Sequence, residues 1–219
     1  MLVFAMVAHE YAHGAAAFSQ GDDTAYMLGR MTLNPIPHID PLMSIVLPAV
    51  LWFGSHGAFT FGGAKPVPVN PRKYRKYRRG DIIVSAAGVV TNFGLALVCA
   101  LVFALAGVVG HALPDAGAVL NAVQRMLAWG IWINLLLCFF NLIPIPPLDG
   151  SHIFYHLLPP AIGSQYRALY RFGFIPLLVL LLFLPGVTNW LLTPAFLSLN
   201  ALFRLIAPFQ LESGLHLFA

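Results

Sequence analysis

The chain has 219 residues, of which 59% are hydrophobic and only 9% are charged, and its formal net charge is +4. A soluble domain carries about 25% charged residues, so this composition excludes an ordinary soluble protein and indicates an integral membrane protein. Six of the twelve Lys and Arg residues lie at residues 72–79, a pattern that favours a loop at the membrane surface and no nucleic-acid partner.

Residues 1–19 are predicted to form a helix that carries the pattern H-E-x-x-H. Positions four apart share one face of a helix, so His9 and His13 would point at the same metal ion. Glu10 lies beside them as a base for the attacking water. A chance cluster on a surface helix is the alternative, but ionisable groups within such an apolar run are costly to keep.

Two segments of the next fifty residues are candidates for strands. Residues 27–33 lie in a polar stretch and fit a short strand. Residues 62–70 are predicted to be extended, as either an edge strand or a loop, because Pro66 and Pro68 forbid a helix and a central strand. A longer form of this segment, residues 59–70, or the strand at 27–33 could pair with another extended peptide by strand addition.

The basic stretch at residues 72–79 sets the expected orientation. Short loops rich in Lys and Arg stay cytoplasmic, and Tyr74 and Tyr77 suit the lipid headgroup level; contact with anionic lipid is a lesser alternative. Residues 41–54 are apolar but number only fourteen and contain Pro48. They therefore fit a re-entrant or interfacial segment that dips into the membrane and returns.

The first full-length span is predicted at residues 82–109. Small or polar residues recur along it at every fourth position: Gly88, Asn92, Ala96, Ala100 and Ala104. Such a stripe is typical of close helix packing in lipid. Asn92 must find a partner inside the bundle, either through an interhelical hydrogen bond or at the functional site.

The next span, residues 126–143, follows an expected polar loop at 110–122 and ends in a proline-rich motif at residues 141–150. A backbone broken by prolines at membrane depth is tolerated only where it is buried in protein or lines a cavity. Asp149, an isolated carboxylate in this motif, is our candidate for the third metal ligand. An Asp oxygen beside two imidazoles leaves the fourth position of a zinc ion for water.

Two pairs of residues compete with Asp149. His152 and His156 are four residues apart and could be ligands, but the start of a helix facing the cytoplasm explains them equally well. His38 and Asp40 are expected to be structural polar groups at the re-entrant turn.

The predicted fold is an all-α polytopic membrane protein. It is a transmembrane helix bundle with a re-entrant segment and a small β-strand element on the cytoplasmic side. We expect one domain over residues 1–219, with a catalytic core at about 1–160. A C-terminal helical hairpin is expected at about 168–207, with its turn at residues 185–186.

The motifs resemble those of the site-2 protease family of intramembrane zinc metalloproteases. The resemblance rests on H-E-x-x-H at residues 9–13, on N-x-x-P-x-P-P-L-D-G at residues 141–150, and on Gly88-x-x-x-Asn92 between them. It is strongest for the short bacterial members without a PDZ insert, and it covers residues 1 to about 160.

The resemblance implies one Zn²⁺ per chain, bound by His9, His13 and Asp149, with Glu10 as the general base. It also implies that Asn141 lines the site and helps to hold the substrate or the oxyanion. Asn92 is a second candidate for substrate binding. Family members usually have more hydrophobic sequence before H-E-x-x-H, so Met1 is expected to be a late start or the result of truncation.

The expected function is that of a zinc-dependent intramembrane endopeptidase. Its partners would be a transmembrane protein or peptide substrate and the lipid bilayer. We expect a multi-pass protein of a bacterial inner membrane, with the active site nearer the cytoplasmic face. The alternative is a non-catalytic zinc-binding membrane protein, either a pseudoprotease or a transporter. The intact Glu10 argues against the first, and the lack of inverted repeats in the sequence argues against the second.

Overall fold

The computed structural model describes residues 1–57, 60 and 62–211. Three of its helical segments are long and apolar enough to cross a membrane: α4 (Tyr77–Ala112), α5 (Gly117–Asn141), and α9 (Pro185–Ile206) together with the 3-10 turn η6 (Ala207–Phe209). The number rises to four if Pro160–Phe172 and Ile175–Phe183, which are bent by 84°, form one broken span. The chain is therefore an integral membrane protein, as its composition predicts.

The chain divides into two compact units. The amino-terminal unit is Met6–Gly88, and the carboxyl-terminal unit contains Met1–Ala5 and Val89–Ala219. Both α1 (Leu2–Ser19) and α4 contribute residues to each unit. The helix predicted at residues 1–19 is confirmed, since α1 covers Leu2–Ser19.

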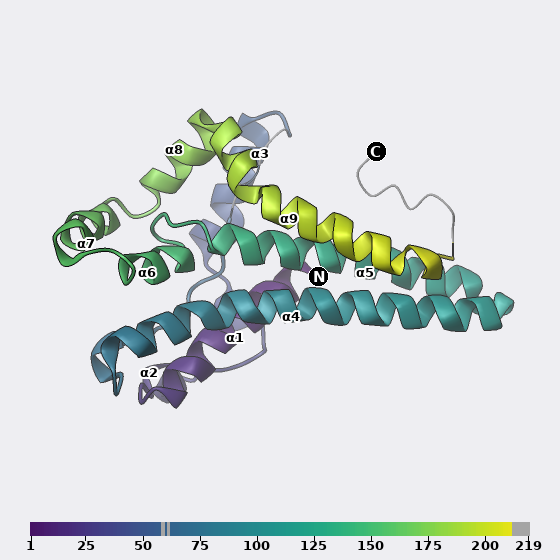
Figure 1. The fold of residues 1–219 in the computed structure, drawn as a ribbon, viewed down its shortest axis with the longest axis horizontal. Helices are drawn as coiled ribbons and strands as arrows, with labels where there is room; N and C mark the ends of the chain where they lie inside the picture. Colours follow the sequence, from purple (N-terminus) through teal and green to yellow (C-terminus); the bar gives the residue numbers. More distant parts are fainter. Residues whose placement is uncertain (58–59, 61, 212–219) are drawn as a thin grey trace. The chain divides into compact units, whose positions relative to one another are not determined.

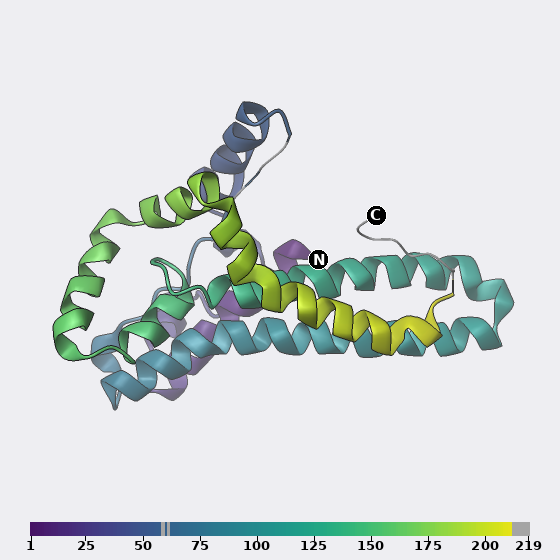
Figure 2. The ribbon, with the colours of Figure 1, turned by 45° about the horizontal axis from the view of Figure 1, so that its top comes forward.

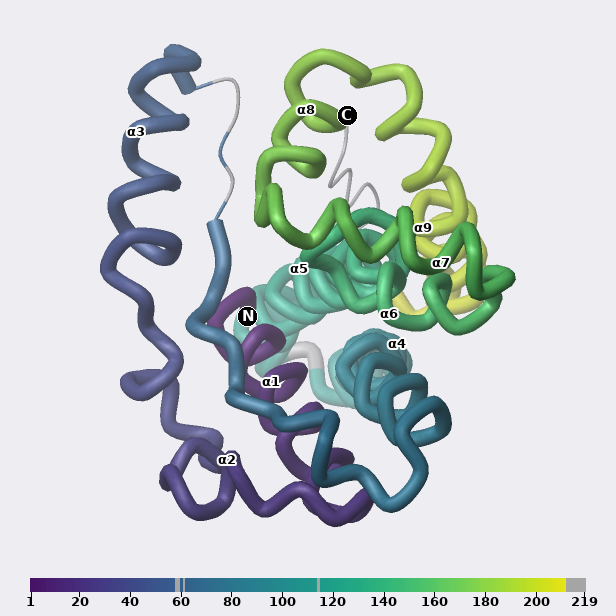
Figure 3. Tube along the Cα trace, turned by 90° about the vertical axis from the view of Figure 1, so that its left-hand side faces the viewer, coloured from purple at the N-terminus to yellow at the C-terminus, as the bar shows by residue number. Residues whose placement is uncertain are grey.

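Four short helical elements follow α1 in the amino-terminal unit: α2 (Thr24–Met27), the 3-10 turn η1 (Ile36–His38), the π-helical turn η2 (Pro41–Val46) and α3 (Leu47–Gly54). Together η2 and α3 form an apolar stretch of fourteen residues, which is too short to span a bilayer. The chain then returns beside this stretch (Figure 3). The Gly63 N–H donates to the Met43 carbonyl at 3.1 Å, and the Ser44 hydroxyl donates to the Gly63 carbonyl at 2.7 Å.

The predicted β-strand element is wrong, since none of the described residues forms a strand. Residues 27–33 begin inside α2, and Gly29 then adopts a φ of 63°, a left-handed conformation that interrupts an extended chain. Residues 62–70 contain neither helix nor strand. Their prolines, Pro66 and Pro68, lack the N–H groups that a strand ladder requires. Residues 59 and 61 of the longer segment, residues 59–70, lie outside the described part of the chain.

The basic loop contains the 3-10 turn η3 (Pro71–Lys73) and is anchored by Tyr74. The Tyr74 ring is buried against Ala17 and Val84, so it packs inside this unit. A Cβ atom at Gly80 would lie 2.7 Å from this ring, so glycine permits the close approach. Burial raises the pKa of the Tyr74 hydroxyl.

In the carboxyl-terminal unit α4, α5 and α9 pack around one apolar core, and Figures 1 and 2 show α5 beside both other helices. Nine buried residues form this core: Ala96, Ala100, Phe103, Leu127, Ala128, Ile131, Leu135, Leu199 and Ile206. The predicted small-residue stripe is confirmed at Ala96 and Ala100. Ala104 is only half-buried, because a four-residue spacing drifts around a helix of 3.6 residues per turn.

The expected polar loop at residues 110–122 is wrong, because α4 continues to Ala112 and α5 begins at Gly117. A fully buried side chain in α5 ties this end of the unit together. The Gln124 Nε2 donates to the carbonyls of Phe103 at 3.0 Å and Phe209 at 2.8 Å. Its Oε1 accepts from the Leu211 N–H at 3.1 Å. A Cβ atom at Gly107 would collide with the Phe209 carbonyl oxygen.

Four shorter elements connect α5 to α9: α6 (Asp149–Tyr155), α7 (Pro160–Arg167), the 3-10 helix η5 (Ala168–Phe172) and α8 (Ile175–Phe183). The break between α8 and α9 falls at Leu184, next to the turn predicted at residues 185–186. The Thr188 hydroxyl donates to the Leu180 carbonyl at 3.2 Å and ties α9 back to α8. With nine residues, α8 alone is shorter than a full span.

Candidate metal centre

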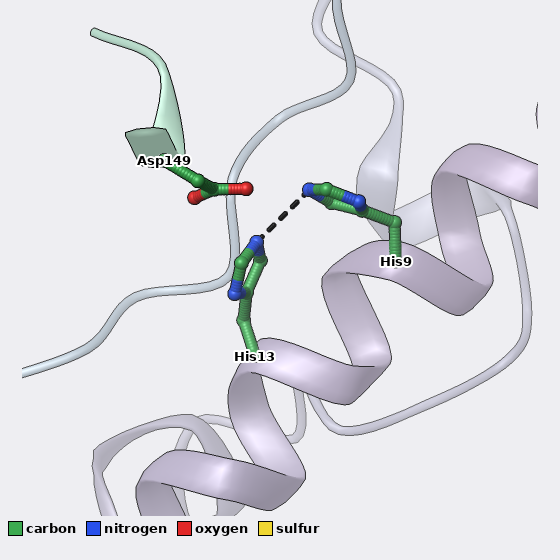
Figure 4. A group of neighbouring side chains, drawn as sticks. All are labelled: His9, His13 and Asp149. Atoms are coloured by element: carbon green, nitrogen blue, oxygen red, sulfur yellow. Dashed lines mark hydrogen bonds between the residues drawn. The ribbon is translucent and has the colours of Figure 1, made fainter. Parts of the chain in front are cut away.

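Two imidazoles meet on one face of α1. The Nε2 atoms of His9 and His13 lie 2.9 Å apart, and the two rings are 4.5 Å apart and nearly perpendicular (Figure 4). His9 is buried. The helical spacing of four residues produces this convergence, so the prediction that the two side chains point at one place is confirmed.

The backbone of α4 orients the second histidine. The Nδ1 of His13 lies 2.7 Å from the Val84 carbonyl oxygen. A carbonyl only accepts, so Nδ1 carries the hydrogen, and the lone pair of a neutral imidazole is left on Nε2. Metal-ligating histidines are typically held in this way by their second nitrogen. Sequence reasoning missed Val84, because a backbone carbonyl has no side-chain signature.

Gly88 leaves room for an ion beside both imidazoles. A Cβ atom at Gly88 would lie 2.6 Å from the Nε2 of His9 and 2.6 Å from the Nε2 of His13. Two Zn–N bonds of about 2.0–2.1 Å at a tetrahedral angle set their nitrogens about 3.3 Å apart. The observed 2.9 Å is close to that separation, so the histidine pair and its glycine cradle fit zinc.

Glu10 is held by the segment that returns from α3. Its Oε2 accepts the Val67 N–H at 2.8 Å. Further bonds fix the segment on the amino-terminal side of Val67. The Lys65 N–H donates to the His38 carbonyl at 2.8 Å, and the Arg30 guanidinium donates to the Lys65 carbonyl at 3.2 Å. One oxygen of the Glu10 carboxylate is thereby oriented by the protein itself.

An almost fully buried carboxylate anchors the other end of this segment. Asp22 accepts the Asn70 N–H on one oxygen, and both the N–H and the hydroxyl of Thr24 on the other. A buried charge is tolerated only when it is hydrogen-bonded in this way. Sequence reasoning missed this anchor, although an Asp two residues before a Thr is typical of a local Asx turn.

Asp149, the predicted third ligand, belongs to the carboxyl-terminal unit and is the first residue of α6. Figure 4 draws its side chain with those of His9 and His13. A Cβ atom at Gly150 would collide with the Leu142 carbonyl oxygen, so glycine lets α6 start directly against the end of α5. The buried Ser151 hydroxyl lies 2.6 Å from the Leu148 carbonyl and 2.7 Å from the Tyr170 hydroxyl. Both contacts fix the first turn of α6.

Three asparagines, the buried Asn92 and Asn134 and the half-buried Asn141, differ in how their amides are satisfied. Asn141 donates from Nδ2 to the Leu137 carbonyl one turn earlier at 2.9 Å, which leaves its Oδ1 as an acceptor. Asn134, one of the residues not predicted, makes the same contact with the Gly130 carbonyl at 2.9 Å. Asn92 is fully buried, and neither its Oδ1 nor its Nδ2 has a partner among the described residues.

The rival histidines of α6 lie against aromatic rings. The ring of His152 is 5.3 Å from that of Tyr170, and the ring of His156 is 5.0 Å from that of Tyr155, both edge to face. His152 lies within α6, and His156 caps the end of this helix.

The second rival pair also has structural partners. The buried His38 places Nε2 3.0 Å from the Thr32 carbonyl. Asp40 begins the apolar stretch, since its side chain accepts from the N–H groups of Leu42 and Met43 at 2.9 Å each. Asp40 is thus a helix cap, as expected for a structural group.

Known proteins resemble the chain over most of its length. Residues 104–182 match Peptidase family M50. The chain is 37% identical over 193 residues to "Putative zinc metalloprotease YwhC" of Bacillus subtilis, a match that covers 88% of this chain and 82% of the relative. It is 30% identical over 182 residues to proteins named "Putative zinc metalloprotease Rip2" of Mycolicibacterium smegmatis and Mycobacterium tuberculosis. Those matches cover 83% of this chain and 64% of each relative. No solved structure gave a significant match.

Proposed function

The chain belongs to peptidase family M50, the site-2 protease family, and is a zinc metalloendopeptidase; from this premise we propose that it cleaves peptide bonds in or near transmembrane segments of other membrane proteins. The observation that carries the proposal is the histidine pair on α1, oriented by Val84 and cradled by Gly88. It occurs in a chain with three apolar spans, so the substrates that share its environment are membrane-embedded.

We assign His9, His13 and Asp149 as ligands of one zinc ion per chain. Each offers one atom of a type that zinc binds. Three protein ligands leave a position open, as a catalytic rather than a structural zinc site requires. When bound, zinc polarises the scissile carbonyl and makes water a stronger nucleophile at neutral pH.

Glu10 is the general base of the proposed reaction. It takes a proton from the attacking water and later delivers that proton to the leaving amine. The Val67 N–H occupies its Oε2, which orients the carboxylate and leaves Oε1 for the proton transfers. A base within hydrogen-bond reach of its proton contributes roughly 10²–10⁴-fold to the rate.

Asn141 and Asn92 are assigned to the substrate. Asn141 stands at the end of α5, eight residues before Asp149, and its remaining N–H suits an oxyanion or a substrate carbonyl. Asn92 has an amide with no partner among the described residues. A buried amide that lacks partners is costly, and a substrate backbone group or a water molecule would satisfy it.

Substrate capture by strand addition would depend on carbonyl groups of residues 64–70. The N–H groups of Lys65, Val67 and Asn70 already donate to the protein, and both prolines lack an N–H. A substrate strand beside this segment would therefore mainly donate its own N–H groups. We place the site nearer the cytoplasmic face of a bacterial inner membrane, because the basic loop precedes α4.

The test combines zinc analysis with cleavage of a transmembrane substrate. Purified wild type should contain about one zinc per chain, lost in His9→Ala and in Asp149→Ala and retained in His152→Ala. Glu10→Gln should keep its zinc and lower cleavage by at least roughly a hundredfold. Zinc retained in Asp149→Ala would refute the ligand assignment. Normal cleavage by Glu10→Gln would refute the general base, and zinc without any cleavage by wild type would favour a non-catalytic zinc protein.

A further inference from the structure

A concave pocket of about 500 Å³ lies at the start of α4, within the amino-terminal unit. It is lined by Lys76, Arg78, Arg79, Ile82 and Ile83. The proposed reaction uses none of these five residues. The pocket is shallow and open, and its lining is mostly apolar, formed by the two isoleucines together with three cationic residues.

Helical spacing produces this combination. Lys76, Arg79 and Ile83 are separated by three and four residues, so they follow one side of the helix and of the residue that leads into it. The cations thus stand about one turn before the isoleucines. The helix that follows contains a stretch of 18 residues with a mean hydropathy of 2.6, against 1.5 in each of the other two long helices of the described chain. The boundary between lipid headgroups and acyl chains is therefore expected at the pocket itself.

Two other basic residues of this unit are engaged elsewhere. Lys73 forms a salt bridge with Asp23, and Arg30 donates to the Lys65 carbonyl. Lys76 and Arg79, in contrast, are exposed and turn toward the pocket that they line. Lys76 directly precedes α4 and Arg79 lies in its first turn, where the helix dipole also favours negative charge, so the two cations suit a phosphate group.

We propose that this pocket binds the phosphate of an anionic phospholipid headgroup. Lys76 and Arg79 contact the phosphate, and Ile82 and Ile83 contact the first methylene groups of the acyl chains. Inorganic phosphate and a lipid headgroup could both bind the two cations. Only a lipid would also cover the apolar part of the pocket, so we assign the phosphate to a lipid. The bound lipid would fix the depth of α4 in the bilayer, and with it Val84, whose carbonyl holds His13.

Native mass spectrometry of the full chain tests this proposal. The protein is purified in detergent with equal amounts of phosphatidylglycerol and phosphatidylcholine, and the retained lipid is counted. Wild type should keep phosphatidylglycerol, and the double variant Lys76→Gln/Arg79→Gln should lose it. Diffuse surface attraction is worth roughly fivefold per cation. We expect the double variant to lose much more phosphatidylglycerol than a control variant that removes two charges outside the pocket.

The matched control is Arg72→Gln/Arg75→Gln, which removes two exposed cations from the same loop. It should lose no more phosphatidylglycerol than diffuse attraction explains, and the charge-conserving Arg79→Lys should retain the lipid as wild type does. Equal loss of phosphatidylglycerol in both double variants would show that diffuse attraction, and not the pocket, retains the lipid, and it would overturn the proposal. So would displacement of the lipid by excess inorganic phosphate, or equal retention of both lipids by wild type. The readout requires neither zinc nor cleavage, so its failure leaves the proposed protease activity untouched.

Discussion

At the level of single residues, the space for a metal ion beside the histidine pair exists because Gly88 has no Cβ atom. Replacing Gly88 with Ala adds a Cβ that meets His9 and His13 at 2.5–2.6 Å, where no ion could sit between them and α4. We expect Gly88→Ala to lose most of its zinc while it keeps its helix content. Elemental analysis and circular dichroism of the purified variant measure the two quantities.

Gly94 provides the control on the same helix. An added Cβ there meets nothing within 4 Å, so Gly94→Ala should keep its zinc and gain about 0.5–1 kcal/mol of helix stability. Full zinc content in Gly88→Ala would show that the cradle is not required for the metal.

Sequence reasoning located the side chains on α1 but not the groups that orient them. The convergence of His9 and His13 follows from helical periodicity alone, so it was predictable. The Val84 carbonyl could not be found, because every residue carries one and only the packing of α4 selects it. Gly88 is part of both the small-residue stripe and the Gly88-x-x-x-Asn92 motif in the sequence, but its proximity to the imidazoles required the structure.

At the level of elements, residues 64–70 determine how the proposed base is held. Val67→Pro removes the one N–H that Glu10 accepts and suits a segment that already contains two prolines. A hydrogen bond to a charged group is worth about 1.5–3 kcal/mol. We therefore expect kcat to fall by roughly tenfold to a hundredfold with unchanged zinc content, as measured by steady-state cleavage and elemental analysis.

Val69→Pro is the matched control, two residues further along and on the same edge of the extended segment. It adds the same ring and the same stiffness, and it leaves the Glu10 contact in place. Its kcat should stay near that of wild type. An equal fall in both variants would show that stiffness of the segment, and not the Val67 N–H, matters for turnover.

The elements also show where local sequence patterns mislead. The extended course of residues 62–70 was predictable, because proline restricts the backbone wherever it stands. The strand at residues 27–33 was not confirmed, since α2 and the left-handed Gly29 take up that stretch. Asp22, which anchors the extended segment at Asn70, is 48 positions distant in the chain, beyond the reach of any local pattern.

At the level of the whole molecule, the carboxyl-terminal unit is closed by the residues after α9. Gly107→Ala places a Cβ on the Phe209 carbonyl, and the Gln124 contact with that carbonyl is lost as the segment moves away. A buried polar group left unpaired costs about 1–3 kcal/mol. For a chain of this size, that cost lowers the unfolding midpoint by roughly 2–4 °C per kcal/mol, which a thermal melt in detergent would detect.

The zinc content of Gly107→Ala should equal that of wild type in the cold, because no proposed ligand contacts this segment. Gly117→Ala, where an added Cβ has open space, should melt like wild type. A melting temperature of Gly107→Ala equal to that of Gly117→Ala would show that the closing segment contributes little to stability.

Composition and hydropathy predicted the membrane class, since apolar length alone decides whether a helix can span a bilayer. They did not predict how far the helices extend. The stretch at residues 110–122 looks like a polar loop, yet much of it is helical. The partners of Gln124 come from positions 103 and 209, so its burial is understandable only from the folded chain.

The prolines beside Glu10 also bear on the lifetime of the enzyme. A protease whose backbone lies against its proposed general base is exposed to cleavage of its own chain there. Val67 stands between Pro66 and Pro68, whose rings restrict the backbone on either side. This restriction opposes the rotations that would expose a peptide bond of this segment to attack by water. We therefore expect this segment to resist cleavage by the enzyme itself while it lies next to the proposed base.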